Sequence, residues 1–279
     1  FVLKKFLDKT KPLEMERVCN ILRFCIKHNQ NVLEPILNVD KKFVDKKNRL
    51  YLTKYYHGKK FSSSPNEIIN LAKNLSQLHK VLQKVPNSYY FIRDSSDYNL
   101  INHTEVKKIK GIIRNKKNKD KHDNLINARI DFLEDCILNT KDTPKHKTLL
   151  KKQFIHNDLN PDNILFQKDG TSVIIDFGSL KIGNIMSDVV FCSFRFSIYN
   201  TTSLKKIKKR ILLFLENYKK NNNYGHLEFD EYIKILLKII LGKISFLLRQ
   251  KYFQKSDLWT KEILKFFEQM EICLKIFKM

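Results

Sequence analysis

The sequence predicts an α+β fold with a small, strand-rich N-terminal lobe over residues 1–57 and a large, mainly helical C-terminal lobe over residues 58–279. Three observations support this prediction. The first lobe alternates short apolar runs with one amphipathic helical pattern. Residues 154–177 contain two strand-like runs on either side of an Asp-Gly pair, which is typical of a β-hairpin. After Gly178, apolar residues recur at helical spacing to the end of the chain.

Each strand and helix expected in the N-terminal lobe is predicted by a pattern in its own stretch of sequence. Residues 1–6 predict a short strand, and apolar residues at helical spacing predict a helix over about 13–28. Two further strands are expected over 36–39 and 50–56, separated by a charged turn at 45–48. The expected order is therefore strand, helix, strand, strand.

The C-terminal lobe begins with a clear helix start. Ser64 is followed by a proline and then by Glu67, a pattern typical of a capping box, and the helix is expected to run to about residue 82. Helical spacing returns over 124–139 and again near 147–153. We therefore expect helices to dominate this lobe outside the hairpin.

Charge makes a polyanionic partner the first hypothesis. The chain has 53 Lys and Arg against 29 Asp and Glu, a formal net charge of +24. Such a balance suggests nucleic acid or an anionic membrane. However, only nine of the 53 basic residues are arginine, the residue whose planar guanidinium contacts bases and phosphates bidentately. We attribute the lysine excess mainly to AT-rich codons, and no nucleic-acid partner is favoured.

Composition also indicates the cellular compartment in which the protein is expected. No apolar run of about 18 residues is present, so no transmembrane helix is expected. The five cysteines are odd in number and lack the close spacing of a metal site, which disfavours a disulfide framework. With no visible signal peptide, these features predict a cytoplasmic protein. The oligomeric state has no signature in the sequence.

Asp158, Asn163 and Asp176 form the constellation with the clearest chemistry. Asp158 and Asn163 lie five residues apart across a loop, and Asp176 follows the other arm of the predicted hairpin. Because a hairpin folds back on itself, the three side chains can converge. Two carboxylates and an amide are hard oxygen ligands that suit Mg²⁺, and a carboxylate off the metal can accept a proton from a hydroxyl. These are the parts required for phosphoryl transfer.

The motifs around these residues resemble a known superfamily. The spacing His156-x-Asp158-x-x-x-x-Asn163, followed by Asp-Phe-Gly, is similar to the kinase catalytic signature. The run His-Asn-Asp-Leu-Asn-Pro-Asp-Asn resembles the aminoglycoside phosphotransferase and choline kinase superfamily, with some similarity to its homoserine kinase-type members. A protein kinase is disfavoured, because Asn157 and Asn160 stand where protein kinases have Arg and Lys. The resemblance implies a bilobal protein-kinase-like fold that uses ATP and Mg²⁺.

The resemblance also implies residue roles. Asp158 is expected to be the catalytic base, and Asn163 and Asp176 the Mg²⁺ ligands. Asp188, near the start of the helix after the metal loop, is expected to steady the catalytic loop. His156 is expected to be a scaffold residue bonded to backbone, in preference to a proton-transfer group.

Lys4 is the residue that the resemblance implies for the α- and β-phosphates of ATP. The neighbouring Lys5 points to the other face of the predicted strand. Glu16 on the first helix is the expected ion-pair partner of this lysine, with Glu14 as the rival.

Residues 50–58 resemble the strand and hinge between the lobes of the superfamily. ATP is expected to bond here, through its adenine, to backbone groups around Thr53 and Tyr55. The family's phosphate-covering loop precedes the lysine strand, whereas this sequence begins at Phe1. We therefore expect the first strands and that loop to be missing from the sequence.

The function expected from these residues is that of a small-molecule kinase. It would move the γ-phosphate of ATP to a hydroxyl of an aminoglycoside, choline or another amino alcohol, a sugar, or a hydroxy amino acid, and the sequence does not choose among them. The alternative is a binding protein, either a catalytically silent pseudokinase or a basic module for nucleic acid or lipid. The presence of Asp158, Asn163 and Asp176 together favours the kinase, since a silent module does not need all three.

Overall fold

The computed structural model describes residues 1–6, 11–89, 99–140, 152–168, 171–222 and 227–278. The chain divides into two compact units. The first comprises Phe1–Ser95 and His146–His226, and the second comprises Ser96–Lys145 and Leu227–Met279. The boundary predicted after residue 57 falls inside the first unit. A division into lobes at that point stays a prediction.

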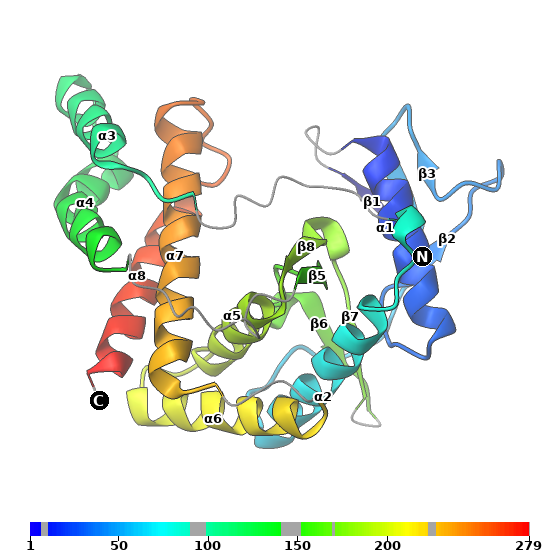
Figure 1. Cartoon of the computed structure of the whole chain (residues 1–279). Helices are drawn as coiled ribbons and strands as arrows, with labels where there is room; N and C mark the ends of the chain where they lie inside the picture. Colours follow the sequence, from blue (N-terminus) through cyan, green and yellow to red (C-terminus); the bar gives the residue numbers. More distant parts are fainter. Residues whose placement is uncertain (7–10, 90–98, 141–151, 169–170, 223–226, 279) are drawn as a thin grey trace. The chain divides into compact units, whose positions relative to one another are not determined.

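A small antiparallel sheet forms the N-terminal part of the first unit (Figure 1). Its strands are β1 (Val2–Lys5), β2 (Pro35–Ile36), β3 (Val44–Asp45) and β4 (Leu50–Thr53). β4 pairs with each of the other three. The sequence does not predict β3, because a two-residue strand is too short to give a periodic signal and forms only by pairing with β4.

Helix α1 (Pro12–Lys27) confirms the predicted amphipathic helix. Its buried positions follow helical spacing: Met15, Val18, Cys19, Ile21, Leu22 and Cys25. The segment after the helix joins the hairpin predicted within residues 154–177. The N–H of Leu33 donates to the carbonyl of Ile174 (2.9 Å), and the N–H of Ile174 donates to the carbonyl of Asn31 (3.0 Å).

The predicted hairpin is confirmed for its two strands, β6 (Ile164–Phe166) and β7 (Ser172–Ile174), which pair antiparallel. The Asp-Gly pair at its turn lies outside the described residues. A second ribbon pairs β5 (Lys152–Ile155) with β8 (Lys181–Asn184).

Two helical predictions near this ribbon are wrong. Residues 181–184 form β8, although the sequence after Gly178 predicts only helices. Residues 152–153, at the end of the helical stretch predicted over 147–153, belong to β5; the rest of that stretch lies outside the described residues. Each strand is four residues long and is stabilised by the other, and a local pattern does not contain this pairing.

The first unit also contains helices α2 (Pro65–Leu82), α5 (Ile185–Ser197) and α6 (Leu204–Lys220), and a short 3₁₀ helix, η1 (Asn87–Tyr89). The capping box of α2 is confirmed: Ser64 Oγ accepts a hydrogen bond from the N–H of Glu67 (3.2 Å), and Glu67 Oε2 accepts one from the N–H of Ser64 (3.3 Å). α2 and α5 both pack against α6. Nearly every residue of α5 is buried, so this helix lies in the core of the unit.

The second unit consists of helices in the part of the chain that the structure describes. They are α3 (His103–Asn115), α4 (Lys121–Asn139), α7 (Phe229–Tyr252) and α8 (Thr260–Phe277). α7 and α8 lie side by side (Figure 1). No helix in the described ranges has the length and apolarity needed to cross a membrane. All five cysteines of the chain are free and buried.

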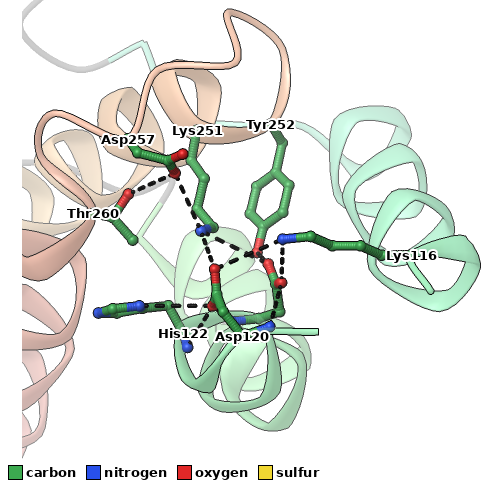
Figure 2. Close-up of polar contacts among 8 residues, drawn as sticks. Lys116, Asp120, His122, Lys251, Tyr252, Asp257 and Thr260 are labelled. Atoms are coloured by element: carbon green, nitrogen blue, oxygen red, sulfur yellow. Dashed lines mark hydrogen bonds and ion pairs between the residues drawn. The ribbon is translucent and has the colours of Figure 1, made fainter. Parts of the chain in front are cut away.

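A polar cluster connects the helix ends of the second unit (Figure 2). The Lys251 cluster, as we call it, consists of Lys116, Asp120, Asp123, Lys251, Tyr252 and Asp257. The nearly buried Lys251 Nζ lies 3.1 Å from Asp120 Oδ2 and 3.6 Å from Asp257 Oδ1. The fully buried Asp123 accepts hydrogen bonds from Lys116 Nζ (2.5 Å) and from the hydroxyl of Tyr252 (2.9 Å). The cluster therefore joins the α3–α4 connection to the α7–α8 connection.

Candidate active site

His156 fixes the loop that follows β5. Its side chain is fully buried, and its Nδ1 accepts a hydrogen bond from the N–H of Asp158 (3.3 Å). Nε2 therefore bears the proton and donates to the carbonyl of Ile175 (3.1 Å). Since backbone groups occupy both ring nitrogens, the geometry supports a scaffold role and leaves no nitrogen for proton transfer to a substrate.

Asp158 and Asn163 are joined across the loop. Asn163 Nδ2 donates to the main-chain carbonyl of Asp158 (2.8 Å), and Asn160 Nδ2 donates to the same carbonyl (3.0 Å). Asn160 also caps the 3₁₀ helix η3 (Pro161–Asn163) by accepting from the N–H of Asp162 (2.9 Å). Within the described ranges, no hydrogen bond or ion pair occupies the half-buried carboxylate of Asp158.

Asp176 lies beside Asn163 at the end of the hairpin. The N–H of Ile175 donates to the carbonyl of Asn163 (2.9 Å), so the residue after it is held next to the loop. Asp176 has φ 61° and ψ 65°, a left-handed conformation that Asp tolerates better than most residues. Its exposed carboxylate accepts a hydrogen bond from the N–H of Gly178 (3.3 Å) and caps the 3₁₀ helix η4 (Phe177–Ser179). The predicted convergence therefore agrees with the hydrogen bonds that link the three segments.

Asp188, in the first turn of α5, holds the start of the loop that contains Asp158. Its buried carboxylate accepts hydrogen bonds from the N–H of His156 (3.0 Å, to Oδ2) and from the N–H of Asn157 (2.8 Å, to Oδ1). Asn157 has φ 65°, so the loop turns through a left-handed residue at this point. These bonds support the structural role expected for Asp188.

A buried chain of hydrogen bonds connects Asp188 to α6 through His79. His79 Nε2 lies 3.1 Å from Asp188 Oδ2, and His79 Nδ1 lies 2.8 Å from the hydroxyl of Tyr218. Because a carboxylate only accepts, Nε2 donates to Asp188 and the neutral Nδ1 accepts from Tyr218. Burial opposes ionisation of Asp188, but the hydrogen bonds that its carboxylate accepts from His79 and from the N–H of Asn157 outweigh it and lower the pKa of Asp188.

Lys4 lies on the face of the N-terminal sheet that includes Tyr51. The two residues are direct partners across β1 and β4, and such partners project from the same face. Burial raises the pKa of the Tyr51 phenol, and the negative charge of Asp176 raises it further. On β1 the other face, with Leu3 and Lys5, is exposed.

The Lys4–Glu16 ion pair is not formed among the described residues. Glu16 Oε1 accepts a hydrogen bond from the N–H of Phe43 (3.3 Å), while its buried Oε2 has no hydrogen-bond partner there. A buried carboxylate oxygen without a partner is costly, so a cation at this position would be favourable. The pairing stays a prediction. The rival, Glu14, lies in the first turn of α1.

Thr53 and Tyr55 mark the end of β4. Thr53 is fully buried and its hydroxyl donates to the carbonyl of Val2 (3.3 Å). Tyr55 is half exposed, and its ring packs edge-on against His57. The backbone role expected for both residues in adenine binding stays a prediction.

The donors around Asn163 and Asp176 are chemically suited to Mg²⁺. Asn163 uses its Nδ2 in the loop, which leaves its amide oxygen as the ligand atom, and Asp176 retains a second carboxylate oxygen. In the described ranges no group of three or more His, Cys, Asp and Glu side chains is arranged for a metal. A site with one amide and one carboxylate fits Mg²⁺, which takes its other ligands from phosphates and water.

Two residues of the first unit, Tyr51 and Tyr218, have no signal in the sequence that relates them to the candidate site. Tyr51 is buried on the sheet face that includes Lys4, and Tyr218 hydrogen-bonds to His79, the partner of Asp188. Tyr51 alternates with half-buried residues on β4, a pattern that indicates its burial but does not indicate which residues surround it. Tyr218 is one aromatic residue of an amphipathic helix, and nothing local connects it to His79.

Comparison with protein families identifies a match over most of the chain. A model described as the phosphotransferase enzyme family matches residues 1–213. No curated protein sequence matches the chain.

Solved structures share the fold at low sequence identity. An aminoglycoside phosphotransferase from Alicyclobacillus acidocaldarius aligns with a TM-score of 0.67 and 13% identity over 99% of this chain and 84% of that chain. An amicoumacin kinase solved with AMP-PNP, Ca²⁺ and Ami aligns with a TM-score of 0.62 and 13% identity over 98% of this chain and 80% of that chain. An ethanolamine kinase from Plasmodium vivax aligns with a TM-score of 0.60 and 16% identity over 99% of this chain and 75% of that chain. These similarities confirm the predicted α+β fold.

Proposed function

The chain belongs to the phosphotransferase enzyme family, and we propose that it is an ATP- and Mg²⁺-dependent kinase that phosphorylates a hydroxyl group of a small molecule. One observation supports this most strongly. The side-chain amide of Asn163 donates to the carbonyl of Asp158, and the main-chain carbonyl of Asn163 accepts from the N–H of Ile175, the residue before Asp176. These bonds join the segments that carry the unpaired carboxylate of Asp158 and the two candidate metal ligands.

Asp158 is the proposed catalytic base. Its carboxylate orients the acceptor hydroxyl and takes its proton as the hydroxyl oxygen bonds to the γ-phosphorus of ATP. The bond between that phosphorus and the bridging oxygen of the β-phosphate breaks, and ADP leaves with the electron pair. His156 and Asp188 contribute by holding the loop, and not by proton transfer.

Asn163 and Asp176 are the proposed metal ligands. Mg²⁺, when bound there, neutralises charge on the phosphate oxygens. Lys4 would hold the α- and β-phosphates, and Glu16 would position its ammonium. The adenine would bond to backbone groups near Thr53 and Tyr55.

Similar proteins support the nucleotide and the acceptor class. The amicoumacin kinase was solved with a nucleotide, AMP-PNP, and a divalent cation, Ca²⁺. An ethanolamine kinase and an aminoglycoside phosphotransferase share the fold, and the acceptors implied by their names are small hydroxyl compounds. The proposed acceptors for this chain are aminoglycosides, amino alcohols, sugars and hydroxy amino acids. Five free cysteines favour a reducing compartment such as the cytoplasm.

The test is an ADP-release assay over these four acceptor classes with wild type and Asp158→Asn. We expect one class to accelerate ADP release, and Asp158→Asn to lower kcat by about 10²–10⁴-fold while ATP with Mg²⁺ still raises Tm. Asp162→Asn is the matched control, since this exposed carboxylate of the same loop pairs only with Lys60 (3.6 Å) among the described residues. Near wild-type turnover by Asp158→Asn would contradict the assignment. A Tm that responds to polyanions without Mg²⁺, and never to ATP with Mg²⁺, would favour a silent binding protein.

A further inference from the structure

A hollow of about 910 Å³ lies in the second unit, lined by α4, α7 and α8. Its volume is within the range of about 300–1,000 Å³ that is usual for sites of small organic molecules. Every lining residue belongs to the second unit, whereas the residues proposed for phosphoryl transfer belong to the first. The hollow therefore contains none of the residues proposed for phosphoryl transfer.

The lining is mainly apolar. Ile233 and Cys136 are buried at its floor, and Leu237 and Leu274 are half-buried. Phe132 is 44% exposed and Phe277 is 50% exposed, although both are large aromatic residues. Apolar side chains gathered around a hollow in this way are typical of a ligand site, unlike single exposed apolar residues, which are common. The lining therefore favours a ligand with an apolar body.

The charges of the lining favour an anionic head group. Three exposed lysines contribute to it: Lys234, Lys275 and Lys278. Within the described residues none of the three forms an ion pair, so their charges are available to a ligand. Of the two acidic lining residues, Asp135 and Glu271, the second is neutralised by Arg129, whose Nε lies 3.2 Å from Glu271 Oε1. The balance of free charge around the hollow is positive.

We propose that this hollow binds a free amphipathic carboxylate, a molecule with one medium-length alkyl chain and one carboxylate. The alkyl chain lies against Leu237 and Leu274, and the carboxylate faces Lys234 and Lys275. Burial of the chain supplies most of the affinity, because the hydrophobic effect scales with the apolar area removed from water. The lysines select the head group, because exposed ion pairs contribute modestly to affinity.

Three probes with the same chain separate these contributions: laurate, dodecanol and dodecylamine, each below its aggregation concentration. They are titrated into the full chain, with the heat of binding and Tm as readouts. We expect laurate to bind and raise Tm, dodecanol to bind more weakly, and dodecylamine to bind most weakly. Equal binding of laurate and dodecylamine, or no binding of laurate, would overturn the proposal.

Variants locate the site. Leu237→Trp fills the hollow and is expected to remove binding of both laurate and dodecanol. Lys234→Ala combined with Lys275→Ala changes only exposed side chains and is expected to weaken laurate roughly fivefold while leaving dodecanol unchanged. Lys261→Ala, an exposed lysine of α8 outside the lining, is the matched control and is expected to bind as wild type.

Other occupants give different results. A dimer that forms with rising concentration and is lost in Phe277→Ser would mean that a second copy covers the hollow, and would overturn the proposal. Laurate binding that persists unchanged in both the Leu237→Trp and the double lysine variants would also overturn it, because the ligand would then lie elsewhere.

Discussion

His79 Nε2 lies 3.1 Å from Oδ2 of Asp188, and the same carboxylate accepts the N–H groups of His156 and Asn157. One buried group thus connects α2 to the loop that contains Asp158. Such a carboxylate is favourable only while its partners are present, because an uncompensated buried charge is strongly destabilising.

Replacement of Asp188 by Asn should therefore cost about 3 kcal/mol at pH 7, since the amide cannot accept all three hydrogen bonds. The folded-state pKa of Asp188 lies below its unfolded value. Its contribution is present above the unfolded pKa, near 3.9, and is lost as pH falls through the lower folded pKa. Denaturant unfolding at pH 7 and in acid should give a difference between wild type and Asp188→Asn that shrinks in acid. A constant difference would contradict this account.

Lys4 and Lys5 are adjacent residues on opposite faces of β1, which makes them a matched pair. Lys4→Ala should lower kcat/KM for ATP by about tenfold or more, since it removes a charge proposed to contact the phosphates. Lys5→Ala should leave kcat/KM for ATP close to wild type. Steady-state kinetics with varied ATP measure both. If Lys4→Ala and Lys5→Ala lower kcat/KM for ATP equally, the proposal that the Lys4 face of β1 meets the phosphates is wrong.

Gly58 has no room for a side chain. A Cβ added there would lie 2.8 Å from Leu165 Cβ and 3.1 Å from the carbonyl oxygen of Phe166. Next to it, Lys59 exchanges two main-chain hydrogen bonds with Phe166, of 2.7 and 2.9 Å. Gly58→Ala should therefore lower the free energy of unfolding by about 1–3 kcal/mol.

The control for this variant is Gly111→Ala, because an added Cβ at Gly111 meets nothing within 4 Å in the described structure and the residue lies in α3. It should stabilise the protein by about 0.5–1 kcal/mol. Denaturant unfolding compares the two changes. Equal effects would show that contact with Leu165 does not matter.

Lys251 should contribute to stability far more than an exposed lysine. Lys251→Met removes the nearly buried cation and leaves Asp120 and Asp123 with Lys116 as the remaining cation of the cluster, at an expected cost of about 2–3 kcal/mol. Lys265→Met is the control, since its pair with Glu262 is exposed and should change stability little. Thermal unfolding with hydrogen exchange at α3 and α4 measures both. A Lys251→Met protein as stable as the control would contradict this role.

Local signals explain what the sequence predicted correctly. The Ser64–Glu67 capping box and the helices after it depend on contacts within a few residues, so the pattern and the structure agree. The β6–β7 hairpin also pairs strands that are close in sequence. The β5–β8 ribbon differs, because each residue pairs with one that lies 26 to 32 residues away in the sequence, and neither strand is long enough to show a period of its own.

The sequence by itself determined the chemistry available, namely Asp158, Asn163 and Asp176 with His156 and Asp188 near them, because motif spacing and residue type are local properties. Only the tertiary structure decided what surrounds these groups. Tyr51 comes to lie opposite Lys4 through cross-strand register, and Tyr218 comes to bond with His79 through helix packing. Asp188 becomes a buried anion only when α2, α5 and the loop enclose it. Burial and charge proximity depend on the folded arrangement of distant residues, and no local pattern contains them.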